Sequence, residues 1–354
     1  MIRIIEQDIE DKSTNFLVYD IKTCVINSLR RIMLADYENS AFNESNIIVH
    51  NNTSLLHNEI IRHRLSLVPV NTNDTLKVEM NIKNDDNDIK NVYSDNLNII
   101  EGEGEIAKGI LLYKLKKNQE INLTATTDLN TSGKAGIPYR PIVTAFFKII
   151  KQINISNKVS NKKLKSIKEY LIEEYELFEE KNIYSKSKGY KTIGLTHTIR
   201  DKTNVIKNII GKFNLKENDL TIEHLHYNNS PVYSFNIESL FIDPKQILKK
   251  SIQIFKQQLD NFLESEMEVE EEQDFIKLFV KNGTYTISNP LSWFLKENQK
   301  IKFAHYNKLH PFDEFLIIQL SLHNNNDDYI AILQDTLEHM NNYINNMLSL
   351  NIFQ

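Results

Sequence analysis

The sequence predicts an α+β protein of more than one domain, in which one arrangement of strands and helices occurs twice. Its 354 residues have an ordinary globular composition, with 41% apolar and 25% charged residues. At about 150 residues per domain, this length corresponds to two or three domains. Alternating apolar runs and apolar stripes at helical spacing occur near both ends of the chain. These features favour mixed strands and helices around more than one core.

Composition and charge argue against several classes of protein. Gly (9) and Pro (7) are too few for a collagen-like or low-complexity chain. No run reaches the ~20 apolar residues of a membrane span, and residues 1–12 lack the apolar region of a signal peptide. The single cysteine, Cys24, excludes an intramolecular disulfide and a cysteine-rich metal site and favours a reducing intracellular compartment. The net charge of −5 argues against nucleic-acid binding by bulk electrostatics.

The first elements have clear patterns. Residues 1–20 are predicted to form two strands joined by a polar turn. A helix is expected over 22–36, because apolar residues recur there at the three-to-four spacing of one helix face. Those residues are Val25, Ile26, Leu29, Ile32 and Met33. A second helix is expected over 58–67, ahead of the extended segment 68–70.

The middle of the chain has weaker signals. Residues 71–120 are acidic and rich in asparagine, which indicates loops between short strands. A β-type run over 142–150 follows a turn at 133–141 that contains glycine and proline. A charged surface helix is expected over 163–181, and residues 183–230 show no clear pattern.

Two helices with narrow apolar seams are predicted in the second half. The first begins at Asp243-Pro244, an N-cap aspartate followed by proline at the first helical position. The second spans 328–350. In both helices the apolar residues step alternately by four and three, the pattern of a helix that packs along another helix. The seam residues are Leu248, Ile252, Phe255, Leu259 and Phe262 in the first helix, and Leu333, Leu337, Met340, Ile344 and Met347 in the second.

Between these two helices lie an acidic stretch and a series of strands. Residues 264–274 are strongly acidic and are interpreted as a solvated linker. Strands are expected at 275–280, 301–306 and 315–322, and residues 285–296 are expected to pass from a strand into a helix.

The same order of elements occurs at both ends of the chain. Each end has a strand pair, a short helix, further strand and a seam helix. The two short helices have a similar sequence motif, because Asn27-Ser28-Leu29 corresponds to Asn289-Pro290-Leu291. Two such modules in one chain suggest a pseudo-symmetric intramolecular dimer. A linker of about ten residues would reach roughly 33 Å, which suffices for the modules to pack side by side.

One family resemblance rests on the first short helix. The run from Asn27 to Ala35 reads Asn-Ser-Leu-Arg-Arg-Ile-Met-Leu-Ala, and related blocks follow at 52–59 and 63–70. This set resembles the alpha-type subunits of cellular RNA polymerases, namely the third-largest subunit of eukaryotic RNA polymerase II and the archaeal D subunit. Residues 125–133 with Tyr139-Arg140-Pro141 resemble the insert domain of that family more loosely. Residues 235–263 resemble its last strand and dimerisation helix.

The C-terminal module resembles the smaller partner in that family. The matching residues are Tyr285-Thr286-Ile287-Ser288-Asn289, Phe303-Ala304-His305-Tyr306 and His310-Pro311. They are similar to the eleventh polymerase II subunit and to archaeal L, in which the patterns read His-Thr-Leu-Gly-Asn, Ala-Gly-Tyr and His-Pro. Tyr285, Ser288 and His305 depart from these patterns, and Ser288 and His305 stand where the patterns have glycine. A fused pair resembles the arrangement in some large DNA viruses.

The resemblance implies a division of the chain. The fold would contain two alpha-type polymerase dimerisation modules, the first of them interrupted by an insert domain. The implied parts are a first module at 1–45 and 221–264, an insert domain at 46–220, an acidic linker at 265–274 and a second module at 275–354.

The resemblance also implies an architectural function. The protein would be a non-catalytic subunit of a DNA-directed RNA polymerase that assembles the two largest, catalytic subunits. Because the chain has only one cysteine, no cofactor or metal is expected. Small adaptor subunits are further expected partners, and DNA would be contacted only through the complex. The expected location is intracellular. If the protein is viral, the expected location is the virion and the host cytoplasm or nucleus.

The resemblance also assigns site residues by their positions in the family's motifs. Asn27, Leu29, Arg30 and Arg31 are expected on the helix that faces a large subunit or the dimer core, and His63 and Arg64 on the helix of the insert domain. Asn289, Leu291 and Phe294 are expected on the equivalent helix of the second module, where they join the seam residues in packing between modules.

Other interpretations of these residues remain open. Arg30 and Arg31 could be solvated helix residues, or one of them could pair with a carboxylate of a large subunit. The segment 148–168 could be a solvated surface, or it could contact nucleic acid or an acidic protein. The alternative function is a free-standing enzyme or metal-binding protein that uses His and Asp residues of the insert domain. That alternative lacks a His-Glu-x-x-His motif and a cysteine ligand set.

Overall fold

A computed structural model describes most of the chain. The described residues are 2–8, 12–72, 74–132, 142–180, 184, 189–228, 230–272, 275–310, 312–324 and 327–350. The predicted turn at 133–141, with Tyr139-Arg140-Pro141, lies outside these ranges, and so does Pro311. Helices and strands are mixed, and the strand pairings among the described residues are antiparallel, which is consistent with the predicted α+β class.

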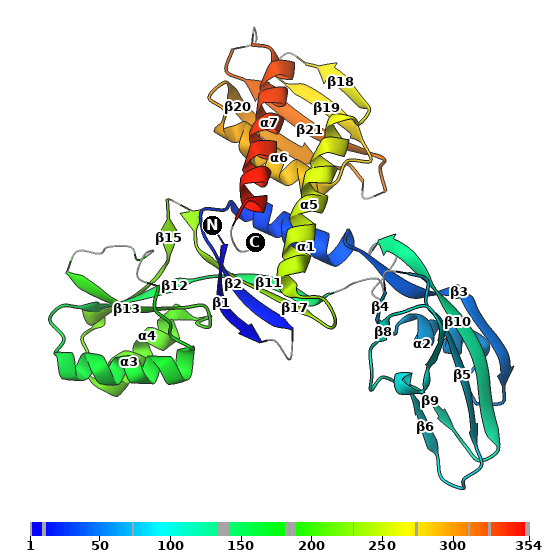
Figure 1. Ribbon diagram of the computed structural model, residues 1–354. Helices are drawn as coiled ribbons and strands as arrows, with labels where there is room; N and C mark the ends of the chain where they lie inside the picture. The colour runs from blue at the N-terminus through cyan, green and yellow to red at the C-terminus, as the bar shows by residue number, and fades with distance from the viewer. Residues whose placement is uncertain are drawn as a thin grey trace.

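The first module is a four-stranded sheet covered by two helices (Figure 1). Its strands, in spatial order, are β1 (Ile2–Asp8), β2 (Ser13–Val18), β17 (Tyr233–Ser239) and β11 (Ile142–Ile149). The helices are α1 (Thr23–Ala35) and α5 (Pro244–Leu263). The predicted start of α5 is confirmed, because the Asp243 side chain accepts a hydrogen bond from the Lys245 amide and Pro244 is the first helical residue.

A first insert unit follows α1. Its sheet has the order β3 (Glu38–Asn52), β10 (Gln119–Ser132), β5 (Lys77–Asn84) and β7 (Asn98–Glu101). Helix α2 (Asn58–Ser66) contacts β3. Two short strand pairs complete the unit, namely β4 (Val70–Asn71) with β8 (Glu105–Ile106) and β6 (Lys90–Tyr93) with β9 (Leu111–Leu115). Buried side chains such as Phe42, Leu65, Met80 and Leu123 give this unit a core of its own.

A second insert unit begins directly after β11. Its sheet has the order β13 (Tyr190–Thr196), β12 (Lys151–Ser156) and β14 (Leu220–His224), accompanied by α3 (Asn161–Tyr175) and α4 (Lys202–Phe213). The short strands β15 (His226–Tyr227) and β16 (Ser230–Pro231) lead back to the first module. Ile153, Ile167, Leu171 and Ile209 lie in a separate core.

The single insert expected at 46–220 is therefore two units in the structure. The chain returns to the first module between them, because β11 pairs with β17. The expected boundaries also differ, since β3 crosses position 45 and β14 pairs with β12 rather than with the first sheet. Each unit buries its own apolar residues, so the two units need no common core. In Figure 1 they project to opposite sides of the first module.

The second module is a four-stranded sheet with two helices on one face. The strand order is β18 (Met267–Glu271), β19 (Ile276–Lys281), β21 (Phe315–Leu322) and β20 (Ile301–Asn307). The helices are α6 (Tyr285–Glu297) and α7 (Tyr329–Leu348), and Asp328 caps α7 by accepting from the amides of Ile330 and Ala331.

Two expectations for this module were wrong. Residues 267–271 of the acidic stretch form strand β18 rather than a linker, and this strand pairs with β19 as the edge of the sheet. Its glutamates remain exposed, which suits an edge strand because charge discourages pairing with another chain. Only residues 264–266 thus separate α5 from β18. Residues 285–296 are helical throughout, with Thr284 at the N-cap position.

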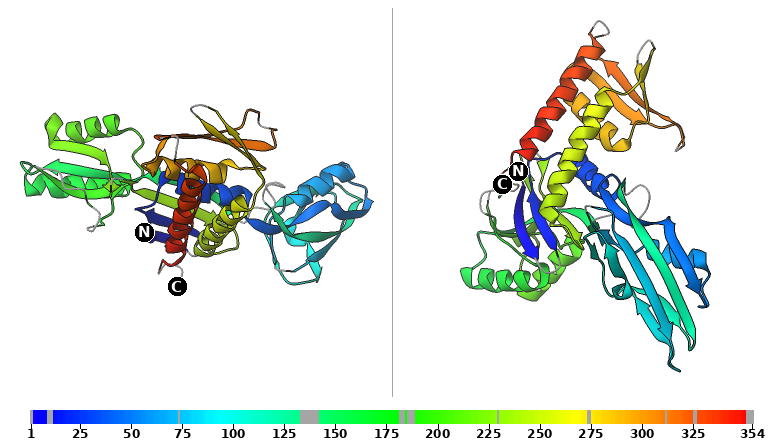
Figure 2. Two further views of the ribbon diagram at one scale, coloured as in Figure 1. Left: turned by 90° about the horizontal axis from the view of Figure 1, so that it is seen from above. Right: turned by 45° about the vertical axis from the view of Figure 1, so that its right-hand side comes forward.

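The two modules meet through their helices. In Figure 2, seen from above, α5 and α7 lie side by side, and these two helices are in contact. Helix α1 crosses beneath them and contacts both α5 and α6.

Candidate functional site

The helix junction between the modules is the largest continuous core of the described chain. Helix α1 packs against α5 and α6, and α7 packs against α5 and α6. One hydrophobic cluster includes Leu29 of α1, Leu248 of α5, Leu291 of α6 and Leu337 of α7. Burial of apolar surface at about 25 cal/mol per Å² is the main favourable term here. The modules are therefore joined by a core and not by a flexible tether.

The structure places the predicted seam residues in this cluster. The five residues of α5 and the five of α7 are buried there, together with Leu291 and Phe294 of α6. Asn289 is only partly buried and is not part of the cluster. The three-residue connection between α5 and β18 places the two seams on one platform.

A hydrogen bond from α1 compensates for the proline in α6. Pro290 has no amide hydrogen, so it cannot bond to the carbonyl of Thr286 four residues earlier. The buried Ser28 hydroxyl of α1 donates to that Thr286 carbonyl at 2.6 Å. The sequence contained a signal for this contact, because a proline inside a helix frees the carbonyl four residues before it. Ser28 and Thr286 were nevertheless not among the predicted site residues.

Lys22 forms a second contact between the modules. Its ammonium lies 2.7 Å from the Glu297 carboxylate and 3.6 Å from the centre of the Trp293 ring. The Lys22 amide donates to the Tyr343 hydroxyl at 3.1 Å, and that hydroxyl donates to the Asp20 carbonyl at 3.3 Å. Burial raises the pKa of Tyr343 to about 12, so the phenol stays protonated and can donate.

Loss of the Lys22 contact is expected to weaken the junction moderately. We expect Lys22→Met to reduce the free energy of unfolding by about 1 kcal/mol, because a partly exposed ion pair and one cation–π contact are lost. Trp293 is the single tryptophan of the chain, so its fluorescence reports this site directly. Urea unfolding followed by that fluorescence measures the effect. Lys256→Met, which removes a Lys256–Asn345 hydrogen bond between α5 and α7, is the control. If Lys22→Met lowers the free energy of unfolding no more than Lys256→Met does, Lys22 does not stabilise the junction as described.

Arg30 and Arg31 border a hollow at the start of α6. The hollow has a volume of about 280 Å³ and is lined by both arginines, Asp36, Thr284 and Thr286. The Arg30 guanidinium donates to Asn27 Oδ1 at 3.0 and 3.2 Å. Burial and the adjacent Arg31 lower the pKa of Arg30. In the part of the chain that the structure describes, neither arginine is ion-paired with a carboxylate.

The start of α6 adds to the positive character of this hollow. The first amides of a helix have no partner within the helix, and Thr284 caps none of them with its side chain. Helix dipoles favour negative charge at such an end. Together with the arginines, this arrangement can bind a carboxylate, and Arg is suited to do so in a bidentate manner.

A larger hollow of about 610 Å³ continues from Thr284 along α5. It is lined by Gln258, Phe262, Lys281 and Asn282, among others. Gln258 donates to Asp36 Oδ2 at 3.0 Å and so connects α5 to the end of α1. The two hollows share Thr284 as a lining residue, and the sequence did not predict them.

His63 and Arg64 lie elsewhere. Both are exposed on α2 of the first insert unit, which surrounds a different core. Arg64 donates to the carbonyl of Leu111 at 2.8 Å. The structure thus brings Asn27, Leu29, Arg30 and Arg31 together with the seam residues, and it places His63 and Arg64 apart from them.

Residues considered for metal binding do not converge in the described ranges. There, no group of three or more His, Cys, Asp or Glu side chains could hold a metal ion. Cys24 is buried in the junction, and burial raises the pKa of its thiol to about 11. None of the described helices is both long and apolar enough to cross a membrane.

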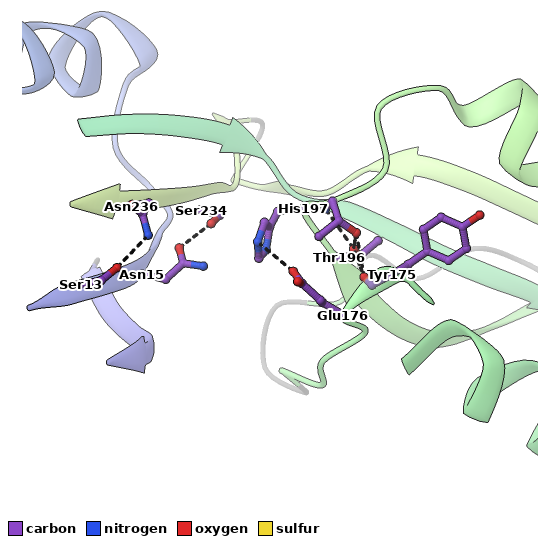
Figure 3. A network of polar contacts seen from close by, with 9 residues as sticks. Ser13, Asn15, Tyr175, Glu176, Thr196, His197, Ser234 and Asn236 are labelled. Atoms are coloured by element: carbon purple, nitrogen blue, oxygen red, sulfur yellow. Dashed lines mark hydrogen bonds and ion pairs between the residues drawn. The ribbon is translucent and has the colours of Figure 1, made fainter. Parts of the chain in front are cut away.

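Polar residues of the second insert unit lie beside polar residues of the first sheet. Figure 3 shows His197 between the strand residues Asn15 and Ser234 and the end of α3 at Glu176. Ser234 donates to Asn15 Oδ1 at 2.5 Å, and His197 Nε2 lies 3.6 Å from the Glu176 carboxylate. Burial and Lys148 lower the pKa of His197, although Glu176 and Glu6 act in the opposite direction.

This environment predicts a pH dependence of stability. Because the folded protein disfavours His197 protonation, the unfolded chain binds the proton more readily. The free energy of unfolding should therefore fall as the pH drops below the ordinary histidine value of about 6.5. His197→Gln should show a weaker fall than the wild type in urea unfolding across that range. Equal pH dependence in the two proteins would show that His197 is not responsible.

Comparison with known proteins gives a family match within the second module. Residues 276–349 match the RNA polymerase Rpb3/Rpb11 dimerisation domain. This segment covers most of the second module, including α6 and α7. The similarities support an alpha-like RNA polymerase subunit.

Three relatives illustrate the range of similarity. The chain is 25% identical over 193 residues to the Saccharomyces cerevisiae DNA-directed RNA polymerases I and III subunit RPAC1, covering 42% of this chain and 56% of that protein. The human RPAC1 is 24% identical over 192 residues, covering 42% and 55%. A conjugation stage-specific protein of Tetrahymena thermophila is 38% identical over 71 residues, covering 20% and 22%. The chain thus spans about half the length of the two RPAC1 proteins.

Proposed function

We propose that this protein is a non-catalytic assembly subunit of a DNA-directed RNA polymerase. Both of its alpha-type dimerisation modules would lie in one chain and form an intramolecular heterodimer. The observation that carries the proposal is the single hydrophobic cluster that joins α1, α5, α6 and α7. The match to the Rpb3/Rpb11 dimerisation domain and the similarity to RPAC1 support it.

The partners in this proposal are the two largest polymerase subunits, with small adaptor subunits as further candidates. The hollow beside Arg30 and Arg31 is the proposed contact for an acidic side chain of one large subunit, because both guanidinium groups lack an ion-pair partner among the described residues. The platform would hold the two catalytic halves together without contributing to nucleotide addition. DNA would be contacted only through the assembled enzyme.

The location and origin are proposals of the same kind. A transcription role implies an intracellular site. A fused pair of modules and a composition rich in asparagine and isoleucine support an origin in a large DNA virus.

A native pull-down tests this function. The tagged full-length chain is recovered from cells that make it, and the co-purifying proteins are identified by mass spectrometry. We expect two much larger chains in a one-to-one ratio with the tagged protein, together with DNA-dependent RNA synthesis. Recovery of a 41.4 kDa monomer alone from cells that produce those chains would overturn the proposal.

The arginine hollow allows a sharper version of this test. We expect Arg30→Glu/Arg31→Glu to lose one large chain, because a like charge then faces the proposed acidic partner. The matched control is Lys108→Glu/Lys114→Glu in the first insert unit, which changes the net charge equally at exposed lysines outside the helix junction. Equal recovery with both pairs of substitutions would exclude the hollow as the contact.

A further inference from the structure

Positive charge is concentrated in the second insert unit. Residues 151–224 contain 15 Lys and Arg against 10 Asp and Glu, a formal charge of +5 in a chain whose total is −5. The rest of the chain therefore carries −10. This segregation of charge within one chain gives the unit an electrostatic character of its own.

Three lysines and two histidines, from this unit and from its borders, lie near one another at the start of β12. We name this group the cationic corner: Lys148, Lys151, Lys202, His224 and His226. Lys148 lies near the end of β11, and Lys151 is the first residue of β12. Lys151 pairs in register with His224 of β14, so their side chains are neighbours on one face of the sheet. Lys202 is the first residue of α4, which packs against β14.

The charge of the cationic corner is not neutralised within the described residues. None of its three lysines forms an ion pair there. The Lys151 ammonium donates to the Ile199 carbonyl, which fixes it in the corner. Burial, Lys202 and Lys148 lower the pKa of Lys151. Burial, Lys202, Lys151 and His226 lower the pKa of His224. The corner thus repels further cations and attracts anions.

Glu223, the acidic neighbour of His224, points to the opposite face of the sheet, and two other acidic residues have partners of their own. Asp201 caps α4 by accepting from the Thr203 and Asn204 amides, and Glu176 faces His197. Since these carboxylates are already engaged, the positive potential remains available to an external anion.

Exposed rings accompany the cations. Phe146 is 39% exposed, and the Lys148 ammonium lies 5.1 Å from its ring centre. The imidazoles of His224 and His226 are also exposed. A surface that alternates cations with ring faces suits a chain that alternates phosphates with planar bases. An acidic protein segment would use the lysines but would offer nothing to stack on these rings.

We propose that the cationic corner binds single-stranded RNA, with the lysines at phosphates and Phe146 and the histidine rings at bases. This inference goes beyond the assembly function and does not depend on it. Three phosphate contacts predict a slope of about −2 in log affinity against log salt, because each contact to a single strand contributes about −0.7.

Fluorescence anisotropy with the full-length protein tests the proposal. The probe is a labelled single-stranded RNA of mixed sequence, about 20 nucleotides long, at low salt near 50 mM. The test variant is Lys148→Glu/Lys202→Glu, and a glutamate at the start of α4 is compatible with the helix dipole. The control is Lys162→Glu/Lys191→Glu, which reverses the charge of two exposed lysines of the second insert unit away from the corner. Thermal unfolding followed by circular dichroism verifies that both variants are folded.

The outcomes separate the possibilities. The proposal expects the test variant to bind at least about tenfold more weakly, with a salt slope reduced by about 1.4, while the control stays within about twofold of the wild type. Absence of wild-type binding at low salt would overturn it, and so would equal losses in the two variants. A polyglutamate peptide that binds more tightly than the RNA at this corner would also overturn it, in favour of an acidic protein partner.

Discussion

Leu259→Asp is expected to abolish the packing between the two modules. Leu259 is fully buried at the contact of α5 with α7, where a carboxylate would have neither water nor a partner cation. Removing a buried leucine side chain alone costs about 2–5 kcal/mol, and burying a charge adds to that cost. Because domains are stable by only about 5–15 kcal/mol, the junction should open.

Two measurements follow this change. Trp293 fluorescence should report a loosened α6 in the isolated protein, and the native pull-down should recover little of the large chains. Met340→Asp on α7 should behave alike, because Met340 is buried in the same cluster. Gln257→Asp on α5 and Gln334→Asp on α7 are the controls, since both residues are exposed on the same helices. Wild-type recovery of the complex from Leu259→Asp would contradict the model of facing helices.

The elements of this junction could be predicted from the sequence because their signals are local. Apolar residues at helical spacing define α5 and α7, and Asp243-Pro244 defines where α5 begins. The repeat of a short helix in each half indicated two related modules. None of these signals requires knowledge of distant contacts.

The divided insert could not be predicted because its cause is long-range. Strand β11 reads as an ordinary β-type run, and only its pairing with β17, about 90 residues later, assigns it to the first sheet. β18 was misinterpreted for a related reason. Its glutamates indicate solvent exposure, and an edge strand is exposed as well, so composition alone does not separate a linker from an edge.

The candidate site was predicted only in part. Arg30 and Arg31 were found through the resemblance, and the structure adds the start of α6 and Gln258, which come from other parts of the chain. Lys22 was missed because a lone lysine before a helix gives no signal. Its significance arises only when Trp293 and Glu297 lie beside it.

The second large effect is expected at Ser28. Its hydroxyl donates a hydrogen bond to the Thr286 carbonyl, which has no helical amide partner because residue 290 is proline. Ser28→Ala should cost about 1–3 kcal/mol of the free energy of unfolding, because the buried Thr286 carbonyl loses its donor. Pro290→Ala should change this cost. Alanine restores an amide four residues after Thr286, so the carbonyl regains a partner within α6. In that background, Ser28→Ala should cost less than about 1 kcal/mol.

The comparison of these variants forms a double-mutant cycle, which isolates the coupling between positions 28 and 290. Urea unfolding followed by Trp293 fluorescence measures the four free energies. Ser251→Ala is the matched control, because Ser251 is buried in α5 and its hydroxyl bonds to the Ile247 carbonyl of its own helix. That carbonyl keeps its helical amide partner, so the control should cost little in either background. A loss for Ser28→Ala that is the same with proline or alanine at 290 would show that the two positions are independent. A coupling of about 1 kcal/mol or more would show that α1 completes the hydrogen bonding of α6, and thus that the first module stabilises the helix around which the second is built.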